Sequence, residues 1–253
     1  MILDSFKLDG KVAIVTGAST GLGQGMAIAL AEAGAHVVGV SSGTMEETQQ
    51  KIEGLGRSFL AIRADLTSIE PIGNIIDKTT EHFGRIDILV NNAGIIRRED
   101  AINFPEKDWD DVININLKTV FFFSQAAARK FIEQGSGGKI INIASMLSYQ
   151  GGIRVPSYTA SKSAVTGITK SLANEWAKFN INVNAIAPGY MITNNTAPLR
   201  ADESRSSAIL ERIPAGRWGT PEDMKGAVVF LASGASDYVN GFTFAVDGGW
   251  LAR

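Results

Sequence analysis

Cysteine is absent from this sequence, and only two histidines occur among its 253 residues. Without cysteine the chain can form neither a disulfide nor a thiolate metal site, which is consistent with a reducing cytoplasm. His36 and His82 are too few for a zinc site built on several histidines, and they disfavour a Ser-His-Asp hydrolase. We therefore expect no bound metal and no cysteine chemistry.

An excess of charge of either sign is also missing. The chain has 24 Lys and Arg residues against 26 Asp and Glu residues, which gives a formal net charge of −2. A balance this close to zero gives no reason to expect nucleic acid or an anionic membrane surface as a partner. The apolar fraction of 45% excludes a disordered chain. We expect a folded protein that acts on a small molecule.

The sequence has no apolar run suited to crossing a membrane. Residues 12–31 carry no charge over a bilayer-spanning length, but Thr16, Ser19 and Gln24 make that stretch polar. The first residues, MILDSFKLDGK, are acidic where a secretory signal would be basic. These features predict an untargeted cytoplasmic protein.

Short β-branched runs alternate with longer segments of helical periodicity along most of the chain. This alternation predicts a parallel sheet with right-handed crossovers and helices on both faces. The expected strands are residues 11–16, 36–40, 58–63, 86–90, 139–144, 181–187 and 242–246. The expected helices are residues 22–33, 46–55, 69–83, 111–134, 158–179 and 221–232.

No linker or repeat divides the chain, so we expect one α/β domain over residues 1–253. Its fold class is a Rossmann-type, doubly wound parallel sheet of about seven strands. A dinucleotide-binding half would take up about residues 1–135, and a catalytic and substrate half about 136–253. The least regular stretch, residues 189–219, is typical of a mobile lid or a partner-contacting excursion.

A glycine-rich loop follows the first expected strand. Gly17, Gly21 and Gly23 stand at the start of a helix, where glycines let backbone approach a phosphate and the helix N-terminus offers free N–H groups. A plain strand-to-helix turn is the alternative, but the position within a βαβ unit favours dinucleotide binding. The spacing Gly-x-x-x-Gly-x-Gly resembles the short-chain dehydrogenase/reductase family.

Further turns at the carboxyl ends of strands support the same resemblance. They include the Asn91–Gly94 segment NNAG, Asp65 after the third strand, and Pro188-Gly189 with Thr193 after the sixth. Each could be an ordinary turn, but open α/β sheets bind ligands at this edge. The resemblance implies a nicotinamide coenzyme in contact with Gly17, Ser19, Thr20, Gly21, Leu22, Gly23, Ser41, Asp65, Leu66, Asn92, Ala93, Gly94, Tyr158, Lys162, Pro188, Gly189 and Thr193.

The second strand ends in Ser41, Ser42 and Gly43, which carry no charge. An acidic residue here would bind the ribose 2′-hydroxyl of NAD, and a basic one would pair with the 2′-phosphate of NADP. An unpaired phosphate dianion costs more than an unsatisfied hydroxyl. We therefore expect NAD rather than NADP.

Tyr158 and Lys162 lie four residues apart on one expected helix, so their side chains share a face. A cation beside the phenol is expected to lower its pKa towards working pH and so create an acid/base group. Ser145 at the end of the fifth strand and Asn116 complete the set found in the family. By resemblance, Tyr158 exchanges a proton with the substrate oxygen and Ser145 hydrogen-bonds that oxygen. Lys162 would hold the nicotinamide ribose, and Asn116 would position a water.

The segment between Ser145 and Tyr158 contains Gln150 and Arg154, and Arg97 and Arg98 follow the NNAG turn. Guanidinium groups favour carboxylates. We expect Arg154 to hold a substrate carboxylate, with Arg97, Gln150 and Tyr190 as further candidate contacts. The runs at residues 95–112 and 142–163 resemble sugar-acid dehydrogenases of the family, which implies reaction at a secondary hydroxyl of a six-carbon deoxy sugar acid.

Two other functions stay open from the sequence. One is a 3-oxoacyl-carrier-protein reductase or polyol dehydrogenase with the same catalytic set, and the other is a nucleotide-binding regulator without turnover. For assembly, the small residues at 126–128 and the apolar C-terminal stretch with Trp250 and Leu251 predict two self-complementary surfaces. Two such surfaces, and the resemblance, predict a homotetramer.

Overall fold

The computed structural model describes residues 1–253 and contains one seven-stranded parallel sheet. Its strand order is β3-β2-β1-β4-β5-β6-β7, so the direction of winding reverses between β1 and β4. The predicted fold class is confirmed. The strands are β1 (Val12–Thr16), β2 (His36–Ser41), β3 (Phe59–Arg63), β4 (Ile88–Asn91), β5 (Gly138–Ile143), β6 (Ile181–Pro188) and β7 (Thr243–Val246).

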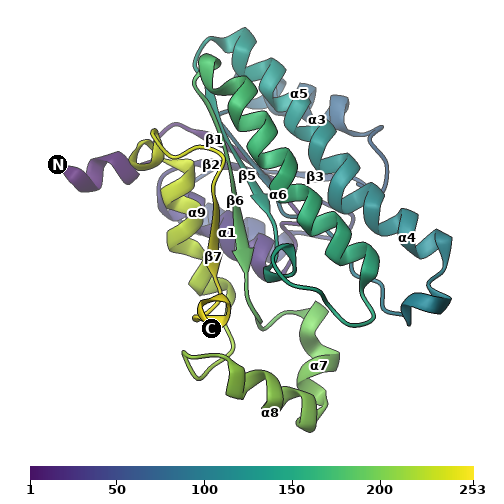
Figure 1. Cartoon of the computed structure of the whole chain (residues 1–253). Helices are drawn as coiled ribbons and strands as arrows, with labels where there is room; N and C mark the ends of the chain where they lie inside the picture. The colour runs from purple at the N-terminus through teal and green to yellow at the C-terminus, as the bar shows by residue number, and fades with distance from the viewer.

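Helices cover both faces of the sheet, because alternate strand residues point to opposite sides (Figure 1). Ala13 and Val15 pack with helices α1, α2 and α9, whereas Val12 and Ile14 pack with α3, α5 and α6. The helices are α1 (Gly21–Glu32), α2 (Glu46–Gly54), α3 (Ile72–Phe83), α4 (Glu106–Ile113), α5 (Thr119–Gln134), α6 (Pro156–Trp176), α7 (Ala197–Ala201), α8 (Glu203–Arg212) and α9 (Lys225–Ala232).

The sequence predicted one helix over residues 111–134, and the structure differs. Helix α4 begins earlier, at Glu106, and a π-turn at Asn114–Lys118 separates it from α5. The buried Asn116 lies in this turn and exchanges hydrogen bonds with the backbone N–H and C=O of Ile95, at 2.9 and 3.0 Å. A polar side chain that binds an outside backbone in this way favours an extra residue in the helical turn.

The segment expected to be irregular, residues 189–219, contains α7 and α8. These two helices extend beyond the carboxyl ends of the strands, below the sheet as drawn in Figure 1. No helix of the structure has the length and apolar character needed to span a membrane.

The two apolar surfaces predicted for self-association are in part buried within the chain, whereas Ala126 and Leu251 are half-buried. Ala127 and Ala128 pack against the sheet, and Trp250 is 4% exposed. Helical periodicity places those alanines on the same face of α5 as Phe123 and Phe131. Large apolar side chains are exposed at many separate points of the surface, among them Trp109 on α4, Ile132 on α5 and Tyr238 before β7. Phe242, at the start of the predicted C-terminal stretch, is exposed as well.

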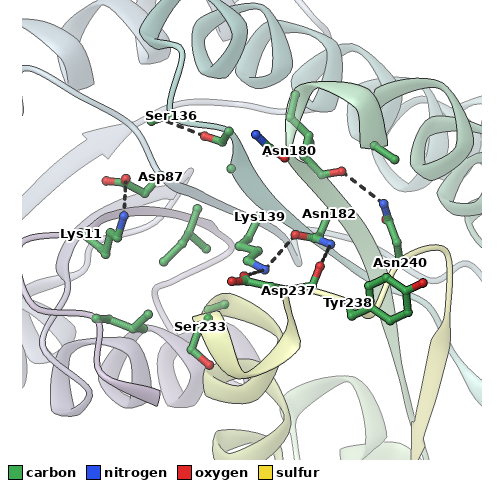
Figure 2. Close-up of a pocket in the computed structure, with 18 of the residues that line it drawn as sticks. Lys11, Asp87, Ser136, Lys139, Asn180, Asn182, Ser233, Asp237, Tyr238 and Asn240 are labelled. Atoms are coloured by element: carbon green, nitrogen blue, oxygen red, sulfur yellow. Dashed lines mark hydrogen bonds and ion pairs between the residues drawn. The ribbon is translucent and has the colours of Figure 1, made fainter. Parts of the chain in front are cut away.

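A cavity of about 750 Å³ lies at the amino ends of the strands, whereas the glycine loop lies at their carboxyl ends (Figure 2). Its charged side chains neutralise one another. Lys11 pairs with Asp87 at 3.2 Å, and Lys139 pairs with Asp237 at 2.7 Å while donating to Asn182 at 2.8 Å. We interpret this cluster as structural, because it joins the ends of β1, β4, β5 and β6.

Replacement of Asp87 by Ala should lower the free energy of unfolding by about 1–3 kcal/mol. The buried carboxylate accepts hydrogen bonds from the Val12 N–H at 3.0 Å and the Arg85 Nε at 2.8 Å, and both would be lost. Urea denaturation measures the effect. Asp9→Ala is the matched control, since it removes only an exposed pair with Arg57 and should change stability little. Equal effects of the two substitutions would contradict a structural role for the cluster.

Candidate active site

The glycine loop joins β1 to α1 with no room for a side chain at its tightest point. Gly17 and Gly21 adopt φ of 67° and 59°, a region that L-residues rarely occupy. A Cβ on Gly23 would lie 2.1 Å from the Gly17 carbonyl oxygen and 2.4 Å from Asn92 Nδ2. The loop is therefore held against the turn after β4, and its backbone lines an open cleft.

Hydrogen bonds fix this contact between the ends of β1 and β4. The Thr16 hydroxyl accepts the N–H groups of Asn92 and Ala93, both at 2.9 Å, and Asn92 Nδ2 donates to the Thr16 carbonyl at 2.8 Å. Helix α1 starts beside the cleft, and its N-cap Thr20 makes no side-chain cap, so the first N–H groups are available to an anion.

The cleft above this loop has a volume of about 320 Å³. Its lining brings together most of the residues predicted to touch a coenzyme. They are Gly17, Ser19, Thr20, Gly21, Leu22, Gly23, Asn92, Ala93, Gly94, Tyr158, Lys162, Pro188, Gly189 and Thr193.

Three further predicted coenzyme residues lie outside the lining of the cleft. Ser41 is adjacent to it, because its hydroxyl donates to Ser19 Oγ at 3.0 Å. Asp65 and Leu66 follow β3; Asp65 is exposed and accepts the Thr67 N–H, whereas Leu66 is buried and its carbonyl accepts from Thr119. Of the three, only Ser41 contacts a residue of the glycine loop.

The four predicted catalytic residues gather where β5 meets α6. Ser145 follows β5, and Tyr158 and Lys162 occupy the first turns of α6. Lys162 Nζ donates to the Ile143 carbonyl at 2.6 Å and lies 5.7 Å from the centre of the Tyr158 ring. Asn116 Nδ2 donates to the Ser161 hydroxyl at 3.2 Å, which links the π-turn to the same helix.

A second cavity of about 300 Å³ meets the first at these residues. Ser145 and Tyr158 line both spaces, as does Gly189. The phenol of Tyr158 thus stands between a cleft formed by the glycine loop and a separate space under α7 and α8. This arrangement suits a phenol that exchanges a proton with a molecule in the second cavity while another molecule occupies the cleft.

The predicted fall in the tyrosine pKa is not what the structure gives. Burial raises the pKa of Tyr158, and this effect outweighs the lowering caused by its hydrogen bond to Ser145 and by the charge of Arg98. Burial also lowers the pKa of Lys162 to about 8. The lysine ammonium is hydrogen-bonded to the backbone of β5, and the buried phenol loses its hydration.

Arg154 and Arg97, predicted to bind substrate, have acidic partners instead. Arg154 lies 3.0 Å from Asp100 and 3.6 Å from Glu99, and Arg97 lies 3.6 Å from both Asp108 and Asp111. Neither arginine lines the second cavity, whereas Gln150 and Tyr190 do.

Arg98, which the sequence placed beside Arg97 as a guanidinium suited to a carboxylate, lines the second cavity. Three further lining residues were missed by sequence reasoning as site residues: Arg205, Arg212 and Trp250. The seven-residue spacing of Arg205 and Arg212 places both on one face of a helix. That signal was hidden because the segment was expected to be irregular.

Comparisons with known proteins agree with this geometry. A family model described as enoyl-(acyl carrier protein) reductase matches residues 17–251. The chain is 68% identical, over the whole of both chains, to 2-dehydro-3-deoxy-D-gluconate 5-dehydrogenase of Escherichia coli. It resembles a crystal structure from Agrobacterium tumefaciens, provisionally assigned as a 2-deoxy-D-gluconate 3-dehydrogenase with bound NADP. That likeness has 56% identity, a TM-score of 0.93, and coverage of 99% of this chain and 100% of the other.

A second solved structure contains two ligands. It is a gluconate 5-dehydrogenase from Burkholderia cenocepacia in complex with NADP and tartrate, 40% identical to this chain, with a TM-score of 0.94 and full coverage of both chains. The relatives thus include sugar-acid dehydrogenases, and both crystal structures hold a nicotinamide dinucleotide.

Proposed function

The chain belongs to the short-chain dehydrogenase/reductase family, and we propose that it interconverts a secondary alcohol and a ketone on a six-carbon deoxy sugar acid. The observation that carries this proposal is the position of Tyr158 between the glycine-loop cleft and the second cavity. The relative from E. coli, identical at 68% of positions, is a 2-dehydro-3-deoxy-D-gluconate 5-dehydrogenase and supports the same reaction.

The glycine-loop cleft fits a nicotinamide dinucleotide, because Gly17 and Gly23 leave a bare backbone cradle beside the N-terminus of α1. When bound, the nicotinamide accepts or donates the hydride. The residues predicted to hold the coenzyme are proposed here in the same roles. Ser41, Asp65 and Leu66 lie outside the lining of the cleft, and of these Ser41 is joined to it by its hydrogen bond to Ser19.

In the direction of oxidation, Tyr158 would take the proton of the substrate hydroxyl while Ser145 hydrogen-bonds the same oxygen. In reduction, Tyr158 would return that proton to the new alkoxide. Lys162 faces the coenzyme cleft, where its ammonium can bind a ribose hydroxyl and attract the tyrosinate. Asn116 is buried and fixes both Ile95 and Ser161, and we propose that it also orients a water for proton relay.

The two alternative functions are less well supported. An acyl chain would require an apolar tunnel, but three arginines line the second cavity. A regulator without turnover would not need the complete set of Asn116, Ser145, Tyr158 and Lys162.

We propose NAD as the preferred coenzyme, because the end of β2 carries no charged side chain. One nearby cation had escaped the sequence analysis. Arg63, at the end of β3, stands in register with Ser41 and donates to the Ser42 carbonyl at 2.9 Å. This exposed guanidinium could pair with a 2′-phosphate, so we also propose a weaker activity with NADP.

We further propose a homotetramer. Among the exposed large apolar side chains, Trp109 and Ile132 lie near opposite ends of the α4–α5 segment, and Tyr238 and Phe242 lie beside β7. Two isologous contacts about different axes generate a tetramer with three two-fold axes.

Tyr158→Phe should lower kcat by about a hundred- to ten-thousand-fold, because it removes the proton-transferring group. Coenzyme binding should persist, since the glycine loop is unchanged. Steady-state oxidation of 2-dehydro-3-deoxy-D-gluconate and titration of NADH fluorescence measure the two effects. Lys162→Ala is the comparison variant and should impair both turnover and coenzyme affinity. Turnover of Tyr158→Phe within tenfold of the parent would exclude the assigned role.

Arg63→Ala should reduce kcat/KM for NADP by about tenfold or more and leave that for NAD nearly unchanged, because only NADP carries the phosphate that the guanidinium could bind. Initial rates at varied coenzyme concentration give both values. Lys78→Ala removes an exposed cation elsewhere and serves as the control. A wild-type preference for NADP would overturn the proposed coenzyme choice. If Arg63→Ala lowered kcat/KM equally for NAD and NADP, the 2′-phosphate would not bind at Arg63.

Light scattering at micromolar concentration should give about four times the chain mass of 27.0 kDa. Replacing both Tyr238 and Phe242 by Ser should reduce the tetramer to dimers, because it removes the apolar side chains of one proposed contact. A mass near that of one chain for the wild type would refute the tetramer. A variant that stays tetrameric would show that this region is not an interface.

A further inference from the structure

The second cavity has an unusual charge composition. Its lining contains Arg98, Arg205 and Arg212 but no aspartate or glutamate. Arg98 comes from the loop after β4, whereas the other two come from α8, more than a hundred residues further along the chain. The fold has therefore brought cations from distant segments to one small space beside Tyr158.

None of these arginines forms an ion pair in the chain, although Arg205 lowers the pKa of the exposed Asp202, first through its backbone N–H and also through its charge. Arg98 donates only to the Asn195 carbonyl, at 3.2 Å, and the guanidinium of Arg212 stacks on the Trp250 ring at 4.0 Å. No carboxylate lies within ion-pair distance of any of the three, although nearby Arg97, Arg154 and Arg217 all have one. A group of like charges held together without counter-ions is a feature that a bound anion would stabilise.

The electrostatics of Arg98 support the same interpretation. Its pKa is lowered, first by burial and then by the charge of Arg205, so the two cations destabilise one another. The same Arg98 acts on Tyr158 and lowers the pKa of the phenol. Because Arg98 and Tyr158 also line the same cavity, a substrate that reaches Tyr158 can contact Arg98.

The surrounding side chains keep the cluster in place. Trp250 donates from Nε1 to Gln150 Oε1 at 2.9 Å and contacts the Tyr190 ring at a centroid distance of 4.8 Å. Arg154, with φ of 65°, binds the two acidic residues that follow Arg98: its carbonyl accepts the Glu99 N–H at 3.1 Å, and its guanidinium pairs with Asp100. The acids nearest in sequence to Arg98 are thus paired elsewhere, and its charge is left for another partner.

We propose that Arg98, Arg205 and Arg212 together bind the carboxylate of the substrate and select acids over neutral sugars. This inference rests on the proposed function, since it assigns a part of the same substrate site. The carboxylate binds between α8 and the loop after β4, and the reacting carbon lies at Tyr158 and Ser145. Because Arg205 and Arg212 are carried on α8, the bound acid also holds this helix over the cavity.

Kinetics with a charged and an uncharged substrate test the proposal. At a pH above the acidic limb of the rate profile, Arg98→Gln and Arg205→Gln should each lower kcat/KM for 2-dehydro-3-deoxy-D-gluconate by about ten- to a hundred-fold, with little effect on its methyl ester. Arg98→Lys, which keeps the charge but loses the planar fork, should recover part of the loss. Arg57→Gln is the matched control, because Arg57 precedes β3 at the amino ends of the strands and does not line this cavity. Equal losses with acid and ester would overturn the proposal.

The pH profile gives a second kinetic readout. Arg98→Gln should move the acidic limb of kcat/KM for oxidation of the ester to higher pH, because removing the cation raises the pKa of Tyr158. Arg57→Gln should leave the limb where it is in the wild type. An unchanged limb in Arg98→Gln would contradict contact between Arg98 and the reacting group.

Tartrate binding separates this proposal from the proposed reaction. Tartrate added to the protein with saturating NAD should change the intrinsic tryptophan fluorescence, to which Trp250 in the cavity contributes. The change should saturate with tartrate concentration in the wild type and should not do so in Arg98→Gln or Arg205→Gln. If the wild type oxidises none of the sugar acids but binds tartrate through these arginines, the proposed reaction fails and the carboxylate site stands. If it oxidises the acid equally well without the arginines, the reaction stands and the carboxylate site fails. Circular dichroism confirms that each variant is folded.

Discussion

The contact between the ends of β1 and β4 is the constraint on which the rest of this structure depends. The absence of a side chain at Gly23 lets the first turn of α1 approach Gly17 and Asn92. Thr16 then joins both strand ends through its hydroxyl group. Without this close approach, the switch point of the sheet would be filled by side chains and could not open into a cleft. The residues from β5 and α6 acquire their position relative to that cleft through the sheet itself.

A second set of hydrogen bonds fixes the reacting groups relative to the sheet. Lys162 is tied to the backbone of β5, while Asn116 ties the loop after β4 to α6 through Ile95 and Ser161. Asn116 lies within the π-turn, where an extra residue in the helical backbone changes the direction in which side chains project. Tyr158 is thereby fixed from two sides before any ligand arrives.

The periodicity of β-branched residues was enough to predict the seven strands and most helices, and the spacing of Tyr158 and Lys162 placed them on one face. The interruption at Asn114–Lys118 could not be predicted, because it depends on a hydrogen bond to Ile95 that only the tertiary structure creates.

The same dependence on tertiary structure explains why the prediction for Arg154 differs from the structure. Its position beside the catalytic segment suggested a ligand, but Glu99 and Asp100 neutralise it from another loop. Burial decides the direction of the Tyr158 pKa shift, and burial is not visible in a four-residue spacing.

The two ends of the strands differ in how charge is distributed. At the amino ends, lysines and aspartates are paired. The two cavities at the carboxyl ends contain four cations and no carboxylate in their linings. A chain with a formal net charge of −2 therefore has a positive entrance to its site. Both a dinucleotide and a sugar acid are anions, so the local field draws them towards the same opening and accelerates their association. Screening by salt weakens such a field over about 10 Å at 0.1 M ionic strength, which makes the rate of encounter dependent on the ionic composition of the surroundings.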